Sequence, residues 1–272
     1  MVVQGREMTE KSRYEERIRH VESHVFSEFN AEMNERAVKK ILTGADGLSR
    51  SIRTLERRAN AMAVYECFVN RNVKSAKDWF FTLSNLQLKR LSLIDPGERH
   101  TAFTSFDGSS SAFSGDTRTQ IEMGAILSSL YQGQSVEPNL QFITEQEALI
   151  FQGISQGPAS RNLIEVSEIQ KNDLLSLDVE LFVKLKSGTD DEIRAILLAI
   201  CDESENRFRL ESGFTEGLMN TPATYYMKLV HMAGRDLSLE HPMLPMELVK
   251  NENDQGRVFK FPELEDVIIS EL

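Results

Sequence analysis

Several features are scarce in this 272-residue chain, and each shortage excludes a class of protein. The two cysteines, Cys67 and Cys201, are too few for a disulfide scaffold or a zinc ribbon, and they suit a reducing compartment. The longest unbroken apolar run, residues 195–201, is seven residues long, whereas a transmembrane helix needs about 20. The first eight residues lack the apolar core of a signal peptide. We therefore expect a folded, cytoplasmic protein with no membrane partner.

Basic residues are scarce in only one part of the chain. The whole sequence has 31 Lys and Arg against 42 Asp and Glu, a net charge of −11. Residues 1–100 hold 18 basic and 14 acidic residues, a balance of +4, which leaves 13 and 28, or −15, for residues 101–272. An acidic body disfavours nucleic acid as a partner, because phosphates bind cations, and it favours a basic partner through long-range attraction. A charge that only maintains solubility is the alternative.

Apolar spacing predicts helices over 6–30, 48–71, 73–93 and from 117 to about 132. In the first of these, Ile18, Val21, Val25 and Phe29 fall on one stripe. In the second half, capping boxes at 144–147 and 189–192 predict two helix starts. A helix over 174–186 and the one after residue 189 form an antiparallel hairpin, and a Thr-Pro pair at 221–222 begins a further helix.

Two segments do not follow the helical pattern. Residues 103–116 are rich in Ser and Gly and predict a long loop. The tail carries Val-Ile-Ile at 267–269, which suits a short strand or a docked segment. We expect one all-α domain, a multi-helix bundle of antiparallel helical hairpins with a minor β element near the C-terminus. Its parts are long N-terminal helices (1–97), a loop (98–116), a helical body (117–250) and an acidic tail (251–272).

Groups able to perform catalysis are few. His20 and His24 are one helical turn apart and could bind zinc, but the metalloprotease pattern needs Glu directly after the first His, and here Glu22 comes one position later. Both cysteines fall on apolar stripes and predict core packing. No phosphate-binding loop or nucleophile elbow is present in the sequence. We expect no catalytic residue, metal or cofactor, and a metal-dependent enzyme using His20 and His24 is kept as an alternative.

Charged clusters suggest binding instead. Residues 165–205 hold 11 Asp and Glu against 4 Lys and Arg, so this face could meet a basic partner. A basic stripe, Arg50, Arg53, Arg57 and Arg58, is interrupted by Glu56 and has no interleaved aromatic residue, which argues against a nucleic-acid interface. A helical scaffold or adaptor for another protein fits the same features.

The order of motifs in the second half resembles the Immunity 49 family of bacterial polymorphic-toxin immunity proteins. The likeness covers about residues 70–250 and rests on a small-residue helix that ends at glycine and is followed by a proline-punctuated ending. These two pieces read TPATYYMKLVHMAG (221–234) and LSLEHPMLPMEL (237–248). The leucine-rich hairpin over 177–203 is similar as well.

This resemblance implies a non-catalytic protein that binds and neutralises a cognate toxin delivered between bacteria. Toxins that attack nucleic acid are often basic, so the acidic second part would suit such a toxin domain. Aromatic residues of the predicted loop would serve as anchors, and clustered acids would give electrostatic complementarity. The predicted partner-binding residues are Phe103, Phe106, Asp107, Phe113, Asp116, Glu165, Glu168, Asp173, Asp202, Glu203 and Glu205. For the three aromatic residues, packing onto the core is the alternative.

Overall fold

The computed structural model describes residues 10–102, 107–153, 163, 175–202, 214–215, 217–250 and 256–269. Within these residues it contains α-helices and two short 3-10 helices but no strand, which confirms the predicted all-α class. The helices are α1 (Glu10–Phe26), α2 (Glu28–Leu42), α3 (Leu48–Phe68), α4 (Val73–Ser92), η1 (Pro96–Glu98), α5 (Arg99–Ala102), α6 (Asp107–Ser114), α7 (Thr117–Ser129), α8 (Pro138–Gly153), α9 (Ser176–Ser187), α10 (Asp190–Cys201), α11 (Thr221–Met232), α12 (Met246–Val249), η3 (Pro262–Leu264) and α13 (Glu265–Ile269).

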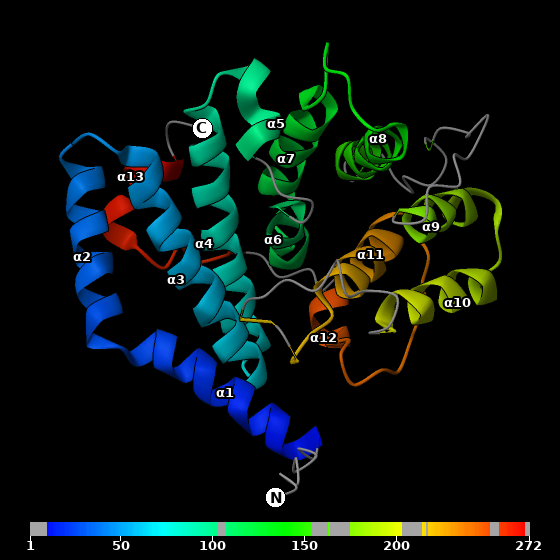
Figure 1. The fold of residues 1–272 in the computed structure, drawn as a ribbon, viewed down its shortest axis with the longest axis horizontal. Coiled ribbons are helices and arrows are strands. Elements are labelled where there is room, and N and C mark those ends of the chain that lie inside the picture. Colours follow the sequence, from blue (N-terminus) through cyan, green and yellow to red (C-terminus); the bar gives the residue numbers. More distant parts are fainter. Residues whose placement is uncertain are drawn as a thin grey trace, which may run out of the picture.

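Helix α4 lies near the middle of the arrangement (Figure 1). On one side it packs against α3, and α2 lies beyond α3, while α1 crosses near the end of this layer. On the other side α6 and α7 contact α4, and α8 to α12 follow. One hydrophobic core runs from Val21 in α1 to Ile268 in α13 and includes both cysteines, as expected. Burial raises the pKa of the Cys67 thiol to about 12.

The first predicted helix is interrupted at Ser27. The Ser27 hydroxyl accepts a hydrogen bond from the Asn30 amide at 3.4 Å and caps a new helix, α2. Val21 and Val25 are buried as predicted, but the change of direction turns Phe29 outward, so that 69% of it is exposed. The predicted stripe of Ile18, Val21, Val25 and Phe29 is therefore broken at Phe29. Helix α2 itself was not predicted.

The predicted loop over 103–116 contains a helix, α6, which takes up residues 107–114 of its described part, 107–116. Its small residues allow close contact with α4, and its hydroxyl groups form hydrogen bonds with polar side chains of that helix. The hydroxyl oxygens of Ser111 and Ser84 lie 2.6 Å apart, and the Ser110 hydroxyl donates to the Gln87 side-chain oxygen. A Cβ atom on Gly108 would lie 2.6 Å from the Tyr225 hydroxyl oxygen, so a larger residue does not fit. Serine and glycine serve here as helix-packing residues, which is why the loop prediction failed.

The capping predictions had mixed outcomes. At Thr189 the box is confirmed: the Thr189 amide donates to the Glu192 carboxylate at 2.8 Å and its hydroxyl accepts from the Glu192 amide at 3.3 Å. The box begins α10, the second helix of the predicted hairpin, and the packing of α9 against α10 is also confirmed. The box at 144–147 is wrong, because α8 begins at Pro138 and Thr144 lies inside it, where its hydroxyl donates to the Leu140 carbonyl. Asn220, not Thr221, caps α11.

The C-terminal segment is docked on α4, and no strand forms among its described residues, 256–269. Residues 267–269 belong to α13, so the predicted β element is wrong and the docked alternative is right. Buried Asp78 accepts a hydrogen bond from the Val258 amide at 3.3 Å and pairs with the Lys260 ammonium at 3.1 Å. The Lys260 amide also donates to the Thr82 hydroxyl at 2.9 Å. Four contacts of this kind fix the segment, counting the Arg257 guanidinium 3.9 Å from Asp78.

Candidate binding site between α1 and α3

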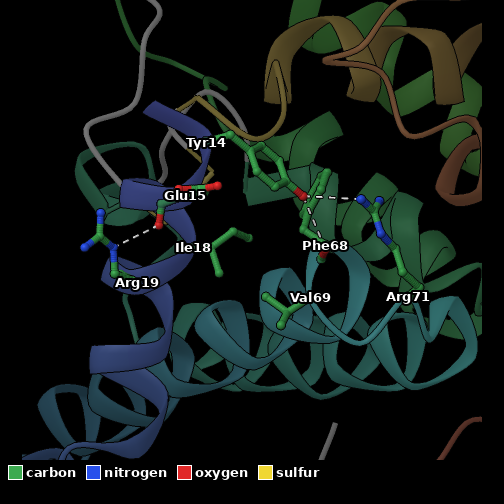
Figure 2. A pocket seen from close by; sticks show the side chains of 7 residues that line it. All are labelled: Tyr14, Glu15, Ile18, Arg19, Phe68, Val69 and Arg71. Atoms are coloured by element: carbon green, nitrogen blue, oxygen red, sulfur yellow. Dashed lines mark hydrogen bonds between the residues drawn. The ribbon is translucent and has the colours of Figure 1, made fainter. Parts of the chain in front are cut away.

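An open pocket of about 640 Å³ lies between α1 and the C-terminal end of α3 (Figure 2). We call it the α1–α3 pocket. Its volume falls in the range of about 300–1,000 Å³ that is usual for ligand sites. It is lined by Tyr14, Glu15, Ile18, Arg19, Phe68, Val69 and Arg71.

Arg71 adopts a backbone conformation that is unusual for its residue type. Its φ of 53° is the one positive value among the described non-glycine residues. The Asn72 amide donates to the Glu66 carbonyl at 2.9 Å, so the chain turns back onto the last turn of α3 directly after Arg71. Glycine usually fills this place, since a side chain here costs about 1–2 kcal/mol. Backbone strain of this kind is often found at functional sites, which makes the contacts of the Arg71 side chain of interest.

Tyr14 holds the Arg71 side chain in place. The Tyr14 hydroxyl donates to the Phe68 carbonyl at 3.3 Å and accepts from an Arg71 guanidinium nitrogen at 3.3 Å (Figure 2). The first bond satisfies a carbonyl in the last turn of α3, which has no partner within the helix. The second orients the guanidinium at the rim of the pocket.

Apolar groups form the centre of the pocket, and a second arginine lies on its other side. Ile18 and Val69 are half-buried, and Phe68 is buried beneath them. Arg19 donates through Nε to the Glu15 carbonyl at 3.3 Å, on the side opposite to Arg71 (Figure 2). The arrangement combines an apolar floor with two exposed cations.

Neither of these two guanidinium groups contacts a carboxylate within the described part of the chain. Other arginines do. Arg36, Arg118 and Arg194 pair with an acid on their own helix. Arg90 of α4 pairs with an acid on α3, and Arg235, which follows α11, pairs with an acid on α10. The pocket therefore has charge available for a ligand.

None of the site residues predicted from the sequence lines this pocket. The signal that could have found it is the short link between α3 and α4, Val-Asn-Arg-Asn at 69–72, which joins two long helices without a glycine. A turn of that kind forces a non-glycine residue into the left-handed region. Asn72 also caps α4 by accepting from the Ser75 amide at 3.1 Å.

Of the predicted aromatic and acidic anchors of 103–116, only Phe113 and Asp116 have described side chains. Phe113 is buried and packs edge-on against Phe80 with ring centres 5.2 Å apart, so the core-packing alternative holds for it. Asp116 caps α7 by accepting from the Thr119 amide at 2.9 Å. Asp107 begins α6, but its side chain is outside the described set. Phe103 and Phe106 also lie outside the described residues.

The acidic segment 165–205 is described only over 175–202, so Glu165, Glu168, Asp173, Glu203 and Glu205 lie outside it. Asp202 is exposed at the end of α10. Three other acids in this range form ion pairs within the protein. A further acid, Asp178, is buried. The pairs are Asp190–Arg235, Asp191–Arg194 and Glu192–Lys184.

The four arginines of the basic stripe on α3 do not share one surface. Arg50, Arg53 and Arg57 point to solvent. Arg58 turns toward α1 and donates to the Val25 carbonyl, and burial lowers its pKa. Glu56, which interrupts the stripe, pairs with buried Arg90 at 2.7 Å.

The two histidines of the metal alternative form an aromatic cluster. The rings of His20 and His24 have centres 4.8 Å apart, and His24 lies edge-on to Phe214 at 4.8 Å. Burial and the neighbouring His20 lower the pKa of His24. In the described part of the chain, no group of three His, Cys, Asp or Glu side chains is placed to hold a metal ion.

A pair of buried carboxyl groups, missed by the sequence analysis, lies where α8, α9 and α11 meet. Burial and the nearby charge of Asp178 raise the pKa of Glu147 well above its usual value, against a smaller opposite effect of the Tyr225 hydroxyl. Asp178 accepts a hydrogen bond from Tyr226, whose ring stacks on that of Tyr225. A protonated Glu147 beside the Asp178 carboxyl group avoids placing two negative charges together. These groups connect three helices through polar contacts in the core.

Comparison with known proteins yields no match: no family model, no curated protein and no solved structure matches the chain. The resemblance to the Immunity 49 family thus stays a prediction that rests on the residues quoted above. No helix in the described portion is both long enough and apolar enough to cross a membrane.

Proposed function

We propose that this chain is a non-catalytic immunity protein that binds and neutralises a cognate interbacterial toxin, and that the α1–α3 pocket is the centre of the contact. The observation that carries the proposal is the composition of the pocket, which joins Tyr14, Arg19 and Arg71 to an apolar floor on an open surface. Tyrosine and arginine are among the residue types enriched at the positions that contribute most to binding energy at protein interfaces. The segment 221–248, which resembles the immunity family, also supports this function.

The pocket lies on well-supported helices. Helix α3 packs along α4, and its Ile52, Leu55 and Ala59 are fully buried. Helix α1 is attached to α3 by the Tyr14 and Arg58 hydrogen bonds. A rigid site loses little conformational entropy when a partner binds, which favours tight and slow-dissociating inhibition. The same helix α1 ends in Phe26, which is 66% exposed and supplies further apolar surface.

The net charge of −11 has a separate role in this proposal. Electrostatic attraction before contact raises the rate at which a basic toxin domain meets the protein. Close contacts in the pocket then set the dissociation rate. The affinity should therefore depend on salt mainly through the association rate.

The test is co-expression with the toxin encoded in the adjacent reading frame. We expect the wild-type chain to restore growth and to form a one-to-one complex with the toxin domain. An Arg71→Glu variant should lose most of the protection, whereas Arg53→Glu, with the same change of charge on the solvent side of α3, should protect fully.

Failure of the wild-type chain to protect or to bind the toxin would contradict the proposed function. Binding of a different cellular protein with the toxin left active would instead identify a scaffold or adaptor. Equal protection by the Arg71→Glu variant would show that the contact lies elsewhere on the molecule.

A further inference from the structure

Resting on the proposed function, the geometry points to a specific chemistry for the partner: we propose that the α1–α3 pocket receives an apolar side chain flanked by a carboxylate from an acidic segment of the partner protein. Such recognition adds to the proposed function, because a toxin that is basic as a whole would have to present a locally acidic segment at this point.

The first support is the distribution of polarity within the pocket. Ile18, Phe68 and Val69 form an apolar floor that a leucine or phenylalanine side chain of the partner would cover. Glu15 and Arg19 lie on one side and Arg71 on the other (Figure 2). An apolar group that enters between the arginines would bring an adjoining anion within reach of a guanidinium.

The second support is the state of the two cations. The hydrogen bonds of the two guanidinium groups go to neutral oxygens, the Glu15 carbonyl for Arg19 and the Tyr14 hydroxyl for Arg71. Each guanidinium has five donors, so both retain donors for a carboxylate after these bonds are made. A carboxylate that accepts two of them would form the bidentate contact that arginine favours.

The third support is the backbone of Arg71. At φ 53° a glycine would close α3 without strain, and the arginine is present despite that cost. Its guanidinium is then positioned by Tyr14 at the rim of the pocket. A purely structural role does not need this side chain, because the helix-closing hydrogen bonds are made by backbone atoms.

The net charge of the protein does not oppose this contact. Its effect on an anionic segment is screened beyond about 8–10 Å in physiological salt. Within contact distance the two arginines dominate, and the one acid in the pocket, Glu15, lies beside Arg19. The pocket is thus a local cationic site on an acidic molecule.

The experiment uses the full chain and three matched peptides, acetylated and amidated, of sequence DLFD, NLFN and KLFK, titrated by NMR. We expect the DLFD peptide to bind about tenfold more tightly than NLFN, since a charge-assisted hydrogen bond is stronger than a neutral one, and KLFK to bind most weakly. Arg71→Gly and Arg19→Gln should each weaken DLFD binding by about tenfold and leave NLFN binding unchanged. Arg53→Gln is the matched control and should change neither.

Equal affinity for the three peptides, preference for KLFK, or no binding of any peptide would overturn the proposal. Decanoate is the fourth ligand: if it binds at the pocket and DLFD does not, the pocket recognises a small amphiphilic acid and the proposed partner segment is wrong. The toxin co-expression result is independent of these titrations, so failure of the recognition claim and failure of the proposed function can be told apart. Thermal unfolding of each variant checks that it is folded.

Discussion

The α1–α3 pocket and the α9–α10 hairpin differ in how they use their charges. The hairpin belongs to the strongly acidic part of the chain, yet its Asp190, Asp191 and Glu192 are all in ion pairs. The pocket belongs to a part with a balance of only +4, yet Arg19 and Arg71 have no carboxylate partner in the described structure. The net charge of a region therefore does not show which of its charges are available to a partner.

The reason lies in helix ends. The first turn of α10 attracts acids, because the helix dipole and unpaired amides favour negative charge there, and nearby Lys and Arg then pair with them. Hydrogen bonds from Lys184 and Thr189 lower the pKa of Glu192 to about 2. Arg71 lies at the opposite kind of end, the C-terminus of α3, where a cation is favourable and its side chain extends over a pocket. Charges used inside the protein should affect its stability, and available charges should affect binding.

The largest expected effect tests an internal charge. An Asp78→Ala variant leaves the Lys260 ammonium and the buried Arg257 guanidinium without this carboxylate, and we expect a loss of about 3–5 kcal/mol in the free energy of unfolding. Urea denaturation measures it. Asp78→Asn, which keeps an acceptor for the Val258 amide, should lose less. A loss below 1 kcal/mol, about the value for a surface pair, would contradict the internal role.

The second effect depends on pH. The folded state holds the Glu147 proton more tightly than the unfolded chain, so the unfolded chain loses that proton first as the pH rises through the usual value of 4.5. Stability should then fall with rising pH, by at most about 1.4 kcal/mol per pH unit, until the folded state also releases the proton. Glu147→Gln should remove this part of the slope between pH 5 and 8 in urea titrations. The exposed Glu180→Gln variant should keep the wild-type slope.

A third and smaller effect concerns the acidic hairpin. Thr189→Ala removes the hydroxyl that caps α10 and should lower the free energy of unfolding by about 1 kcal/mol. Ser187→Ala, two residues earlier on the exposed surface, should change it by less than about 0.5 kcal/mol. Calorimetry measures both. Neither variant should alter DLFD binding, and a change in that affinity would mean that the hairpin contributes to the site.

The smallest expected change has the opposite sign. Arg71→Gly relieves the left-handed strain but adds the flexibility of glycine to the unfolded chain, so we expect a net gain of about 0.5–1 kcal/mol. The same substitution inside α3, Arg53→Gly, should cost about 1 kcal/mol. Greater stability together with weaker peptide binding would show that the arginine is kept for binding. A loss of stability in the Arg71→Gly variant would show that its contact with Tyr14 is structural.

Most of the helices could be predicted from the sequence, because amphipathic spacing and strong caps are local signals. The α3, α4 and α10 segments follow this rule closely. The predictions failed where tertiary contacts change the meaning of a residue. Serines of α6 pair with α4 in the core, and Thr144 and Glu147 are interior residues of α8 although their spacing matches a cap. Such positions depend on neighbours that are distant in the sequence.

The candidate site could not be predicted for a related reason. Its residues come from two separate segments, 14–19 and 68–71, and no motif connects them. Sequence reasoning favoured the conspicuous features, which were a Ser/Gly-rich stretch with aromatics and a run of acids. The structure uses Phe113 and Asp178 of those features in the interior. A residue that stands out in the sequence is therefore not always accessible to a partner at the surface.

The docking of residues 256–269 on α4 also sets an order of assembly. Val258 follows its hydrogen-bond partner Asp78 by 180 residues, and Lys260 follows Thr82 by 178. At about 5–20 residues per second, synthesis of that interval takes roughly 10–35 s. Until then Asp78 and Thr82 have only water for these bonds, and the face of α4 that Phe259 and Leu264 cover in the folded protein is open. A helix made early thus acquires these neighbours only after residues 256–269 have been synthesised, so α4 reaches its full stability only when that segment has docked.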